Sequence, residues 1–374
     1  MLLGVGIYKG EDGKPYVLDS VRKAEQIMLD KKQDKEYAFP DGYPTFRKVA
    51  IELSWGADHP CVKEGRVASM QTVSGTGGLK MGFMLMRKFF PKAKAYVPNP
   101  TWSLHHNIIK STGFDLTYFR YYNPKTKSVD VEGMLEDLST IEDEQILLLQ
   151  ASCHNPSGCD LTKDDWKRVL EVCKTKKHFC FFDSAYQGFA NDDYNEDNWS
   201  LRYFAANYNR VMLTQSFSKN FGLYGERTGC LSMVCADHDE QLKVQTLLKD
   251  TCLPEYSNPP IHGARIVETI MGDPTLKELW HSEVKAMGGR LRNNRKEMVE
   301  KLKNLGSTHD WSHIQNQIGM FAYTGLTEQM VEVLKTQYAI YLPYDGRVCV
   351  ASITQNNIDY VCECFHKVSD GKEL

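Results

Sequence analysis

Short apolar runs alternate with longer amphipathic stretches through the middle of the chain. The apolar runs are four or five residues long and end at polar or turn residues, as buried strands do; they cover 95–98, 146–150, 179–183, 211–214 and 230–234. Helical patterns lie between them, such as 162–175, where Thr162 can cap the helix and Asp165 follows three residues later. This alternation predicts an α/β protein with a mainly parallel sheet covered by helices.

The pattern changes near Asp273. A long helix is predicted over 274–305, and it is followed by two short β runs at 319–323 and 347–351 with a helix between them. We therefore expect two domains. The large domain comprises residues 15–286, and a smaller α+β domain comprises residues 1–14 and 287–374.

Composition narrows the class of protein. The 374 residues are 42% hydrophobic and 25% charged, which is typical of a globular protein and excludes a disordered chain. A net charge of -3 argues against nucleic acid or a membrane surface as partner, and no run approaches the ~18 apolar residues of a membrane span. The first residues do not resemble a signal peptide, and the eleven cysteines lack zinc-type spacing. We expect a cytoplasmic protein with free thiols and no metal site.

A glycine-rich segment, Ser74-Gly75-Thr76-Gly77-Gly78, precedes the helical pattern of residues 79–90. Glycines allow close approach of the backbone, and a helix N-terminus offers unpaired N–H groups to an anion. The spacing matches neither a P-loop nor a dinucleotide fingerprint. An ordinary capped start of a helix is the alternative interpretation.

A lysine follows the predicted strand at 211–214. Ser216 and Ser218 flank it, and Arg227 comes eight residues after Lys219. Open α/β sheets bind ligands beyond the carboxyl ends of their strands, where a lysine can form a Schiff base and serines with an arginine can hold a phosphate. A surface lysine in a polar turn is the alternative.

Two further motifs follow predicted strands. Asp183 ends a very apolar run, and Tyr186 comes three residues later. A carboxylate at a buried strand end needs a cation or several hydrogen-bond donors, although Asp183 could instead cap a helix. Asn155-Pro156 reads as a turn.

Together these motifs resemble the aspartate aminotransferase family, the fold-type I enzymes that use pyridoxal 5'-phosphate. The resemblance covers essentially the whole chain and is carried by the segments 3–6, 100–102, 154–156, 181–188, 215–222, 256–260 and 346–347. It implies an aminotransferase with a large coenzyme-binding domain and a smaller domain. It also implies a homodimer with shared active sites, acting on amino acids and 2-oxo acids.

The resemblance assigns coenzyme contacts to the matching residues. Lys219 would bind the coenzyme covalently and then transfer a proton, Asp183 would pair with the protonated ring nitrogen, and Tyr186 would bond the ring oxygen. The other contacts are Asn155 at the ring oxygen, Trp102 on the ring face, and a phosphate site of Ser74, Gly75, Thr76, Ser216, Ser218, Arg227 and, from the partner subunit, Tyr37. The residues implied to bind substrate are Arg347 at the α-carboxylate, Gly6, Trp102, Asn155 and Phe321.

The chain departs from the family at three points. Leu253 stands where members usually carry an arginine that reaches the second carboxylate of a substrate in the neighbouring subunit. Gln150 replaces a common histidine behind the coenzyme, and the sequence begins at the Gly-Val-Gly motif without the usual N-terminal arm. We expect only modest retuning from Gln150 and a weaker dimer or closure from the missing arm.

Leu253 leaves three functions open. Aspartate with 2-oxoglutarate is the default pair, with Lys249 as a candidate replacement for the arginine. The same chemistry on aromatic or other amino acids is the second, and a non-catalytic coenzyme-binding relic is the third. His105 is expected behind the coenzyme, and the basic residues Arg290, Arg292, Arg295 and Lys296 are expected on a solvated helix face.

Overall fold

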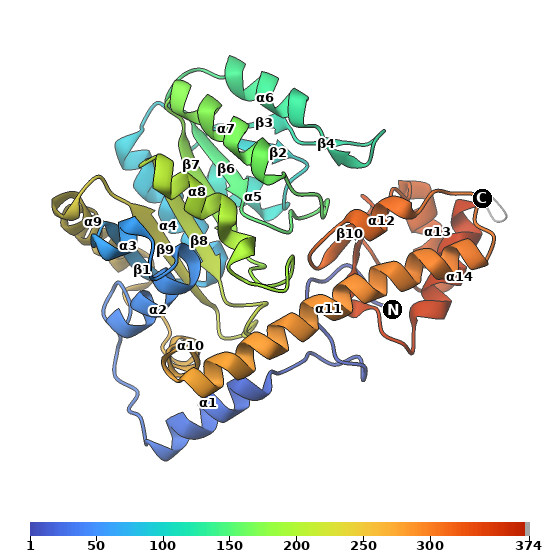
Figure 1. Ribbon diagram of the computed structural model, residues 1–374, viewed down its shortest axis with the longest axis horizontal. Helices are drawn as coiled ribbons and strands as arrows, with labels where there is room; N and C mark the ends of the chain where they lie inside the picture. The colour runs from blue at the N-terminus through green and yellow to red at the C-terminus, as the bar shows by residue number, and fades with distance from the viewer. Residues whose placement is uncertain (371–374) are drawn as a thin grey trace.

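The computed structural model describes residues 1–370, and a seven-stranded sheet forms its centre (Figure 1). The strand order is β1–β9–β8–β7–β6–β2–β3. Neighbours from β8 to β3 are parallel, whereas β9 is antiparallel to both β8 and β1. The prediction of a mainly parallel sheet is confirmed. The bounds are β1 (Val67–Val73), β2 (Ala95–Asn99), β3 (Leu116–Arg120), β6 (Ile146–Gln150), β7 (Phe179–Ser184), β8 (Val211–Ser216) and β9 (Thr228–Val234).

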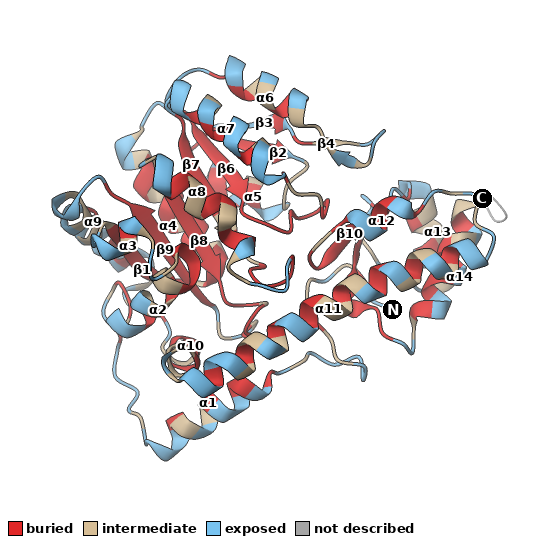
Figure 2. Cartoon of the chain, viewed as in Figure 1, coloured by how far each residue is buried: buried red, intermediate tan, exposed pale blue. Residues whose placement is uncertain are grey.

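Helices cover both faces of this sheet (Figure 1). Successive residues of β6 pack into different cores: Leu147 joins the core with α7 and α8, and Leu148 joins the core with α4. Burial on both faces explains why the strands are continuously apolar (Figure 2). The helices of this half are α1 (Asp19–Asp30), α2 (Pro44–Trp55), α3 (Pro60–Lys63), α4 (Ser74–Phe89), α5 (Leu104–Ser111), α6 (Val131–Thr140), α7 (Lys163–Thr175), α8 (Trp199–Asn207), α9 (His238–Tyr256) and α10 (His262–Gly272).

Helix α7 begins with the predicted capping box. The Thr162 hydroxyl accepts from the backbone N–H of Asp165 at 3.2 Å, and the Asp165 carboxylate accepts from the N–H of Thr162 at 3.1 Å. Two N–H groups at the helix start are satisfied in this way.

The long helix α11 (Pro274–Asn304) joins the sheet half to a smaller assembly (Figure 1). It contacts α1 and α10 in the first part and α12 and α14 in the second. The smaller assembly contains α12 (Ser312–Asn316), β10 (Phe321–Tyr323), α13 (Glu328–Tyr338), β11 (Arg347–Cys349) and α14 (Ile358–Ser369). The division at residues 286 and 287 stays a prediction. Within the described residues, no helix combines the length and the apolar character that crossing a bilayer requires.

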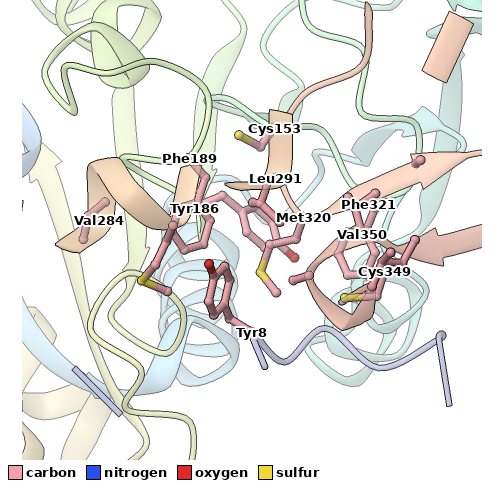
Figure 3. Close-up of a cluster of buried hydrophobic side chains, with 14 of the residues drawn as sticks. Tyr8, Cys153, Tyr186, Phe189, Val284, Leu291, Met320, Phe321, Cys349 and Val350 are labelled. Carbon is pink, nitrogen blue, oxygen red and sulfur yellow. The ribbon is translucent and has the colours of Figure 1, made fainter. Parts of the chain in front are cut away.

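The first residues of the chain belong to this smaller assembly. The N–H of Leu3 donates to Tyr341 at 2.9 Å, and its carbonyl accepts from the N–H of Cys349 at 2.7 Å. A buried cluster then connects the two halves: Tyr186 and Phe189, which follow β7, face Leu291, Met320 and Phe321 (Figure 3).

Arg295 corrects the expectation of a solvated basic face on α11. Its side chain is fully buried and donates to the carbonyls of Gly319 at 2.6 Å and Phe321 at 2.7 Å. Charge alone does not tell which face of a helix a residue occupies, because a buried arginine can be satisfied by backbone carbonyls of a segment distant in sequence.

Gly82 lets α4 approach the sheet closely. A Cβ at Gly82 would lie 2.3 Å from the ring of Phe181 in β7. Gly82→Ala is therefore expected to lower the free energy of unfolding by ~1–3 kcal/mol, because a buried ring must move. Gly272→Ala is the matched control, since a Cβ there meets nothing within 4 Å. Urea unfolding should show Gly272→Ala unchanged or more stable by up to ~1 kcal/mol. Equal losses in both variants would contradict the packing explanation.

Candidate active site

A cavity of about 300 Å³ lies at the carboxyl edge of the sheet. Strands β6, β7 and β8 are parallel and all end at this edge, and β1 runs in the same direction because β9 is antiparallel to both β1 and β8. Thirteen of the predicted site residues line the cavity: Gly6, Ser74, Gly75, Thr76, Trp102, Asn155, Asp183, Tyr186, Ser216, Lys219, Arg227, Phe321 and Arg347. Leu79, Leu104, Gln150 and Ala185 also line it.

Three hydroxyl groups converge at one end of the cavity. The Ser74 hydroxyl lies 3.3 Å from that of Ser218 and 3.5 Å from that of Ser216. Helix α4 begins at Ser74, so its first-turn N–H groups point to the same place. The Arg227 guanidinium lines this cavity as well, and its hydrogen bond goes to the carbonyl of Tyr224. The arrangement suits a phosphate.

The backbone around Ser74 is held in an unusual conformation. Ser74 has φ 62° and Arg227 has φ 50°, and the N–H of Ser74 donates to the carbonyl of Arg227 at 2.9 Å. Left-handed conformations at non-glycine residues cost ~1–3 kcal/mol each and persist where the surroundings enforce them. Gly229 permits the contact, because a Cβ there would lie 2.4 Å from the backbone of Ser74.

Lys219 lies three residues beyond the end of β8. Burial lowers its pKa below the ordinary value for lysine, an effect that Asp183 opposes and Arg227 reinforces. The amine also lies 5.5 Å from the centre of the Tyr186 ring. A lysine in these surroundings is more often neutral, and therefore nucleophilic, than one in water.

Asp183 does not cap a helix but lies within β7, where His105 holds it. The His105 Nε2 is 3.0 Å from the Asp183 carboxylate, and its Nδ1 is 2.8 Å from the Thr101 hydroxyl. This chain of polar groups lies behind the cavity and fixes the carboxylate. The place of His105 behind the coenzyme stays a prediction.

Asn155 connects three parts of the site. Its amide donates to the Tyr186 hydroxyl at 3.3 Å, and its side-chain oxygen accepts from Arg347 at 2.9 Å. Gln150 holds the backbone of Asn155 on both sides, with bonds of 2.9 and 3.0 Å. Burial raises the pKa of Tyr186 above its ordinary value. In the sequence, Gln150 is recognisable only as a replacement for a common histidine, because no local spacing reveals its bonds to the backbone of Asn155.

Arg347 brings the smaller assembly to the cavity. Its guanidinium donates to the carbonyl of Gly4 at 3.1 Å and lies 4.2 Å from the centre of the Phe321 ring. Gly6 lies against the same ring, since a Cβ at Gly6 would be 2.8 Å from it. The Arg347 guanidinium therefore lies in the cavity wall, between the backbone of Gly4 and the ring of Phe321.

Two predicted residues do not line the cavity. Ser218 is buried behind it and reaches Ser74. Tyr37 is 81% exposed in the segment between α1 and α2, so its predicted contact depends on a second subunit. Lys249, the candidate replacement for the missing arginine, lies 3.5 Å from the buried carboxylate of Asp41 and not in the cavity.

Comparison with known proteins identifies the chemistry. The family described as "Aminotransferase class I and II" matches residues 1–365. The chain belongs to the class I and II aminotransferase family. It is 43% identical over 370 residues to the mitochondrial aspartate aminotransferase of Gallus gallus, covering 99% of this chain and 88% of that protein. The mitochondrial enzyme of Dictyostelium discoideum is 43% identical over 367 residues, with 98% and 86% covered.

A solved structure agrees with the aminotransferase assignment. The chain superposes with a TM-score of 0.96 on the crystal structure of an aromatic-amino-acid aminotransferase from Burkholderia pseudomallei covalently bound to pyridoxal phosphate. The two are 39% identical, with 98% of this chain and 92% of that chain covered. This aminotransferase is an enzyme of the fold-type I class that uses pyridoxal 5'-phosphate, and the comparisons give no support to a non-catalytic relic.

The residues of the cavity fit this coenzyme. Three hydroxyls and a guanidinium offer an anion site, a buried amine with a lowered pKa offers the covalent attachment, and a fixed carboxylate offers a partner for a ring nitrogen. The expected cytoplasmic location is wrong: the curated relatives are named mitochondrial enzymes, which points away from it. Free thiols indicate a reducing environment but do not distinguish one reducing compartment from another.

Proposed function

We propose that this aminotransferase exchanges an amino group between L-aspartate and 2-oxoglutarate, giving oxaloacetate and L-glutamate. The observation that carries the proposal is the meeting of Lys219, Asp183 and Arg347 in one cavity beside an anion site. Relatives named aspartate aminotransferase at 43% identity support this pair of substrates.

The coenzyme's phosphate would lie at the hydroxyl end of the cavity. Ser74, Ser216 and Ser218 would donate to it, as would the N–H groups of Gly75 and Thr76, and Arg227 would supply the charge. Anchoring this end sets the distance from the phosphate to Lys219. Tyr37 of a second subunit would complete the phosphate site, so the enzyme would be a homodimer with shared active sites.

Trp102, in the cavity wall, would stack on the face of the coenzyme ring. When bound, pyridoxal phosphate serves as an electron sink for the carbon that loses its proton. Asp183 would hold the proton on the ring nitrogen, with His105 orienting the carboxylate. Asn155 and Tyr186 would donate hydrogen bonds to the ring oxygen.

Lys219 would move the proton. Its amine must be neutral to accept a proton from the α-carbon, and burial already lowers its pKa in that direction. Once protonated, the same amine can return the proton to a neighbouring carbon. The Tyr186 ring, 5.5 Å away, lies beside it.

Arg347 would orient the substrate. A planar guanidinium binds a carboxylate through two parallel hydrogen bonds, so it can hold the α-carboxylate with the α-carbon facing Lys219. The side-chain oxygen of Asn155 accepts a hydrogen bond from the Arg347 guanidinium at 2.9 Å and helps to orient it. Gly6 leaves room for the carboxylate, and Phe321 closes the wall.

A second candidate is the same reaction with aromatic or other uncharged amino acids. The cations that line the cavity from the described part of the chain are Lys219, Arg227 and Arg347, and each already has a role above. Leu253 supplies no charge, and the Lys249 amine forms an ion pair with Asp41 at 3.5 Å. The similarity to an aromatic-amino-acid aminotransferase agrees with this alternative.

A panel of single amino acids separates the two candidates. The protein is reconstituted with pyridoxal phosphate, and aspartate, glutamate, phenylalanine and alanine are added separately while the absorbance of the bound coenzyme is followed. Faster conversion by aspartate and glutamate is expected. Faster conversion by phenylalanine would favour the second candidate, and no conversion at all would contradict both.

Leu253→Arg tests the missing charge directly. A charged partner for a desolvated carboxylate is typically worth ~2–5 kcal/mol, so kcat/KM for aspartate should rise at least ~30-fold, with little change for alanine. Leu242→Arg is the matched control, because Leu242 is similarly exposed on the same helix. An equal rise for aspartate and alanine would show that the new arginine does not bind the second carboxylate.

A further inference from the structure

A second, smaller cavity lies behind the active site. Its volume is about 180 Å³, and its walls come from the segment after β6, the segment after β7, the first turns of α7 and α8, and Ile318 of the smaller assembly. Three carboxylates line it, Asp160, Glu196 and Asp197; Lys163 also lines it and pairs with the exposed Glu196 at 2.6 Å. Asp197 is 3% exposed and Asp160 is partly buried. Across residues 1–370 their hydrogen-bond donors are backbone N–H groups and one amide, not cations.

Asp160 holds the segment that ends at Asn155. One carboxylate oxygen accepts from the N–H of Cys153 at 2.6 Å, and the other accepts from the N–H of His154 at 2.8 Å. Cys153 has φ 55°, a conformation that a residue with a side chain seldom adopts. The carboxylate therefore stabilises a turn that the local sequence disfavours, directly before a residue of the active site.

Asp197 holds the segment that follows Tyr186. One oxygen accepts from the N–H groups of Gly188 at 2.7 Å and Ala190 at 3.0 Å. The other accepts from the backbone and side-chain N–H groups of Asn191, at 3.0 and 2.8 Å. Gly188 has φ 100°, so this turn also departs from ordinary backbone geometry. Four donors converge on one carboxylate.

The two segments meet inside the active site. The amide of Asn155 bonds the Tyr186 hydroxyl at 3.3 Å and Arg347 at 2.9 Å, so a small displacement of either segment breaks a contact of the site. Cys153 and Phe189, which belong to these segments, lie in the apolar cluster beside Leu291 (Figure 3). Apolar packing supports the segments, and the two carboxylates accept from the backbone N–H groups of Cys153, His154, Gly188, Ala190 and Asn191.

We infer that Asp160 and Asp197 are positioning residues, which fix from outside the active site the two segments that bring Asn155 and Tyr186 into contact. Their effect on catalysis rests on the proposed function, whereas their effect on the coenzyme requires only that it be bound. Burial raises the pKa of Asp160 to about 6, and Asp197 contributes to that rise, in agreement with two carboxylates that accept from N–H groups and not from a cation.

A carboxylate only accepts hydrogen bonds, which is what these turns require. An asparagine of the same shape presents an N–H₂ group to one set of donors and loses those bonds. Asp160→Asn and Asp197→Asn are therefore the informative variants. Asp164→Asn and Asp192→Asn are the matched controls: both residues are exposed, they pair with Lys167 and Arg292 respectively, and each lies close in sequence to one of the two.

The first readout is the pH titration of the visible absorbance of the bound coenzyme, which senses Asn155 and Tyr186. Each asparagine variant is expected to shift the midpoint of this titration and to lower the single-turnover rate with saturating amino acid ~10- to 100-fold. The controls should change neither value. If the midpoint is unchanged in both asparagine variants, the inference is overturned. A lower melting temperature alone would then show that the carboxylates only stabilise the fold.

A double-mutant test shows whether the effect passes through the named partners. Asp197→Asn should change the rate much less in a Tyr186→Phe background, and Asp160→Asn much less in an Asn155→Ala background. Full additivity would overturn the inference. Failure of the proposed function gives a different result, because the wild-type protein would then convert none of the amino acids while the coenzyme titration could still be measured.

Discussion

The Lys219→Ala variant is expected to lose amino transfer by at least ~10⁴-fold, because it removes both the covalent attachment and the proton carrier. Lys219 is the only lysine that lines the cavity within residues 1–370, so no second amine is placed to replace it. Turnover with aspartate and 2-oxoglutarate measures the loss, and the absorbance of the covalently bound coenzyme should disappear with it.

Lys285→Ala serves as the control for this result, since Lys285 is an exposed lysine on α11. Circular dichroism should show both variants folded. Turnover retained in Lys219→Ala at more than a hundredth of the wild-type rate would contradict the assigned role. Added small amines are expected to restore part of the activity if the loss is that of a proton carrier.

Arg347→Ala should reduce kcat/KM for alanine ~30- to several-thousand-fold, the range that follows from ~2–5 kcal/mol for a lost partner of a desolvated carboxylate. Alanine is the informative substrate because its only carboxylate is the α-carboxylate. Arg347→Lys should fall between the variant and the wild type, since an ammonium keeps the charge but not the planar fork.

Arg347 also bonds Gly4 and Asn155, so stability must be followed alongside activity. The control is Arg120→Ala, which removes an arginine that is half exposed and paired with Asp137. A loss in Arg347→Ala that appears only in the rate and not in coenzyme binding supports substrate orientation. A full rate with alanine would show that another group holds the α-carboxylate.

The sequence predicts the strands best where they are buried on both faces. Residues 146–150 and 179–183 are continuously apolar up to a polar end, and they become β6 and most of β7. Strand β1 is not predicted by its pattern, since Ser69, Gln71 and Thr72 are polar yet buried. The amide of Gln71 donates to the carbonyl of Pro260, a partner that only the folded chain provides.

Helix α4 shows how tertiary contacts extend a pattern. The sequence predicts a helix from residue 79, whereas the structure begins it at Ser74 and includes three glycines of the motif. Glycine disfavours helix by about 1 kcal/mol per residue relative to alanine. At Gly78 the packing nevertheless requires glycine, because a Cβ there would lie 2.1 Å from the hydroxyl oxygen of Thr214.

The residues that line the cavity could be found in sequence because they sit in short, ordered motifs, several of them at strand ends. The roles of Asp160, Asp197 and Arg295 could not be found in the sequence. Each acts on backbone groups of a segment that folds against it, and an isolated aspartate near a turn or an arginine on a helix has many ordinary explanations. The contact exists only once the chain has folded.

The bonding of residues 3 and 4 to residues 341–349 has a consequence for protein synthesis. Leu3 is bonded to Tyr341 and Cys349, and the carbonyl of Gly4 holds Arg347. A growing chain emerges from the ribosome N-terminus first, so Leu3 and Gly4 lack these partners until residues 341–349 have been translated. The sheet and the phosphate end of the cavity can form earlier, because their residues precede 235. We therefore expect the nascent chain to become able to hold phosphate before it can recognise an amino acid.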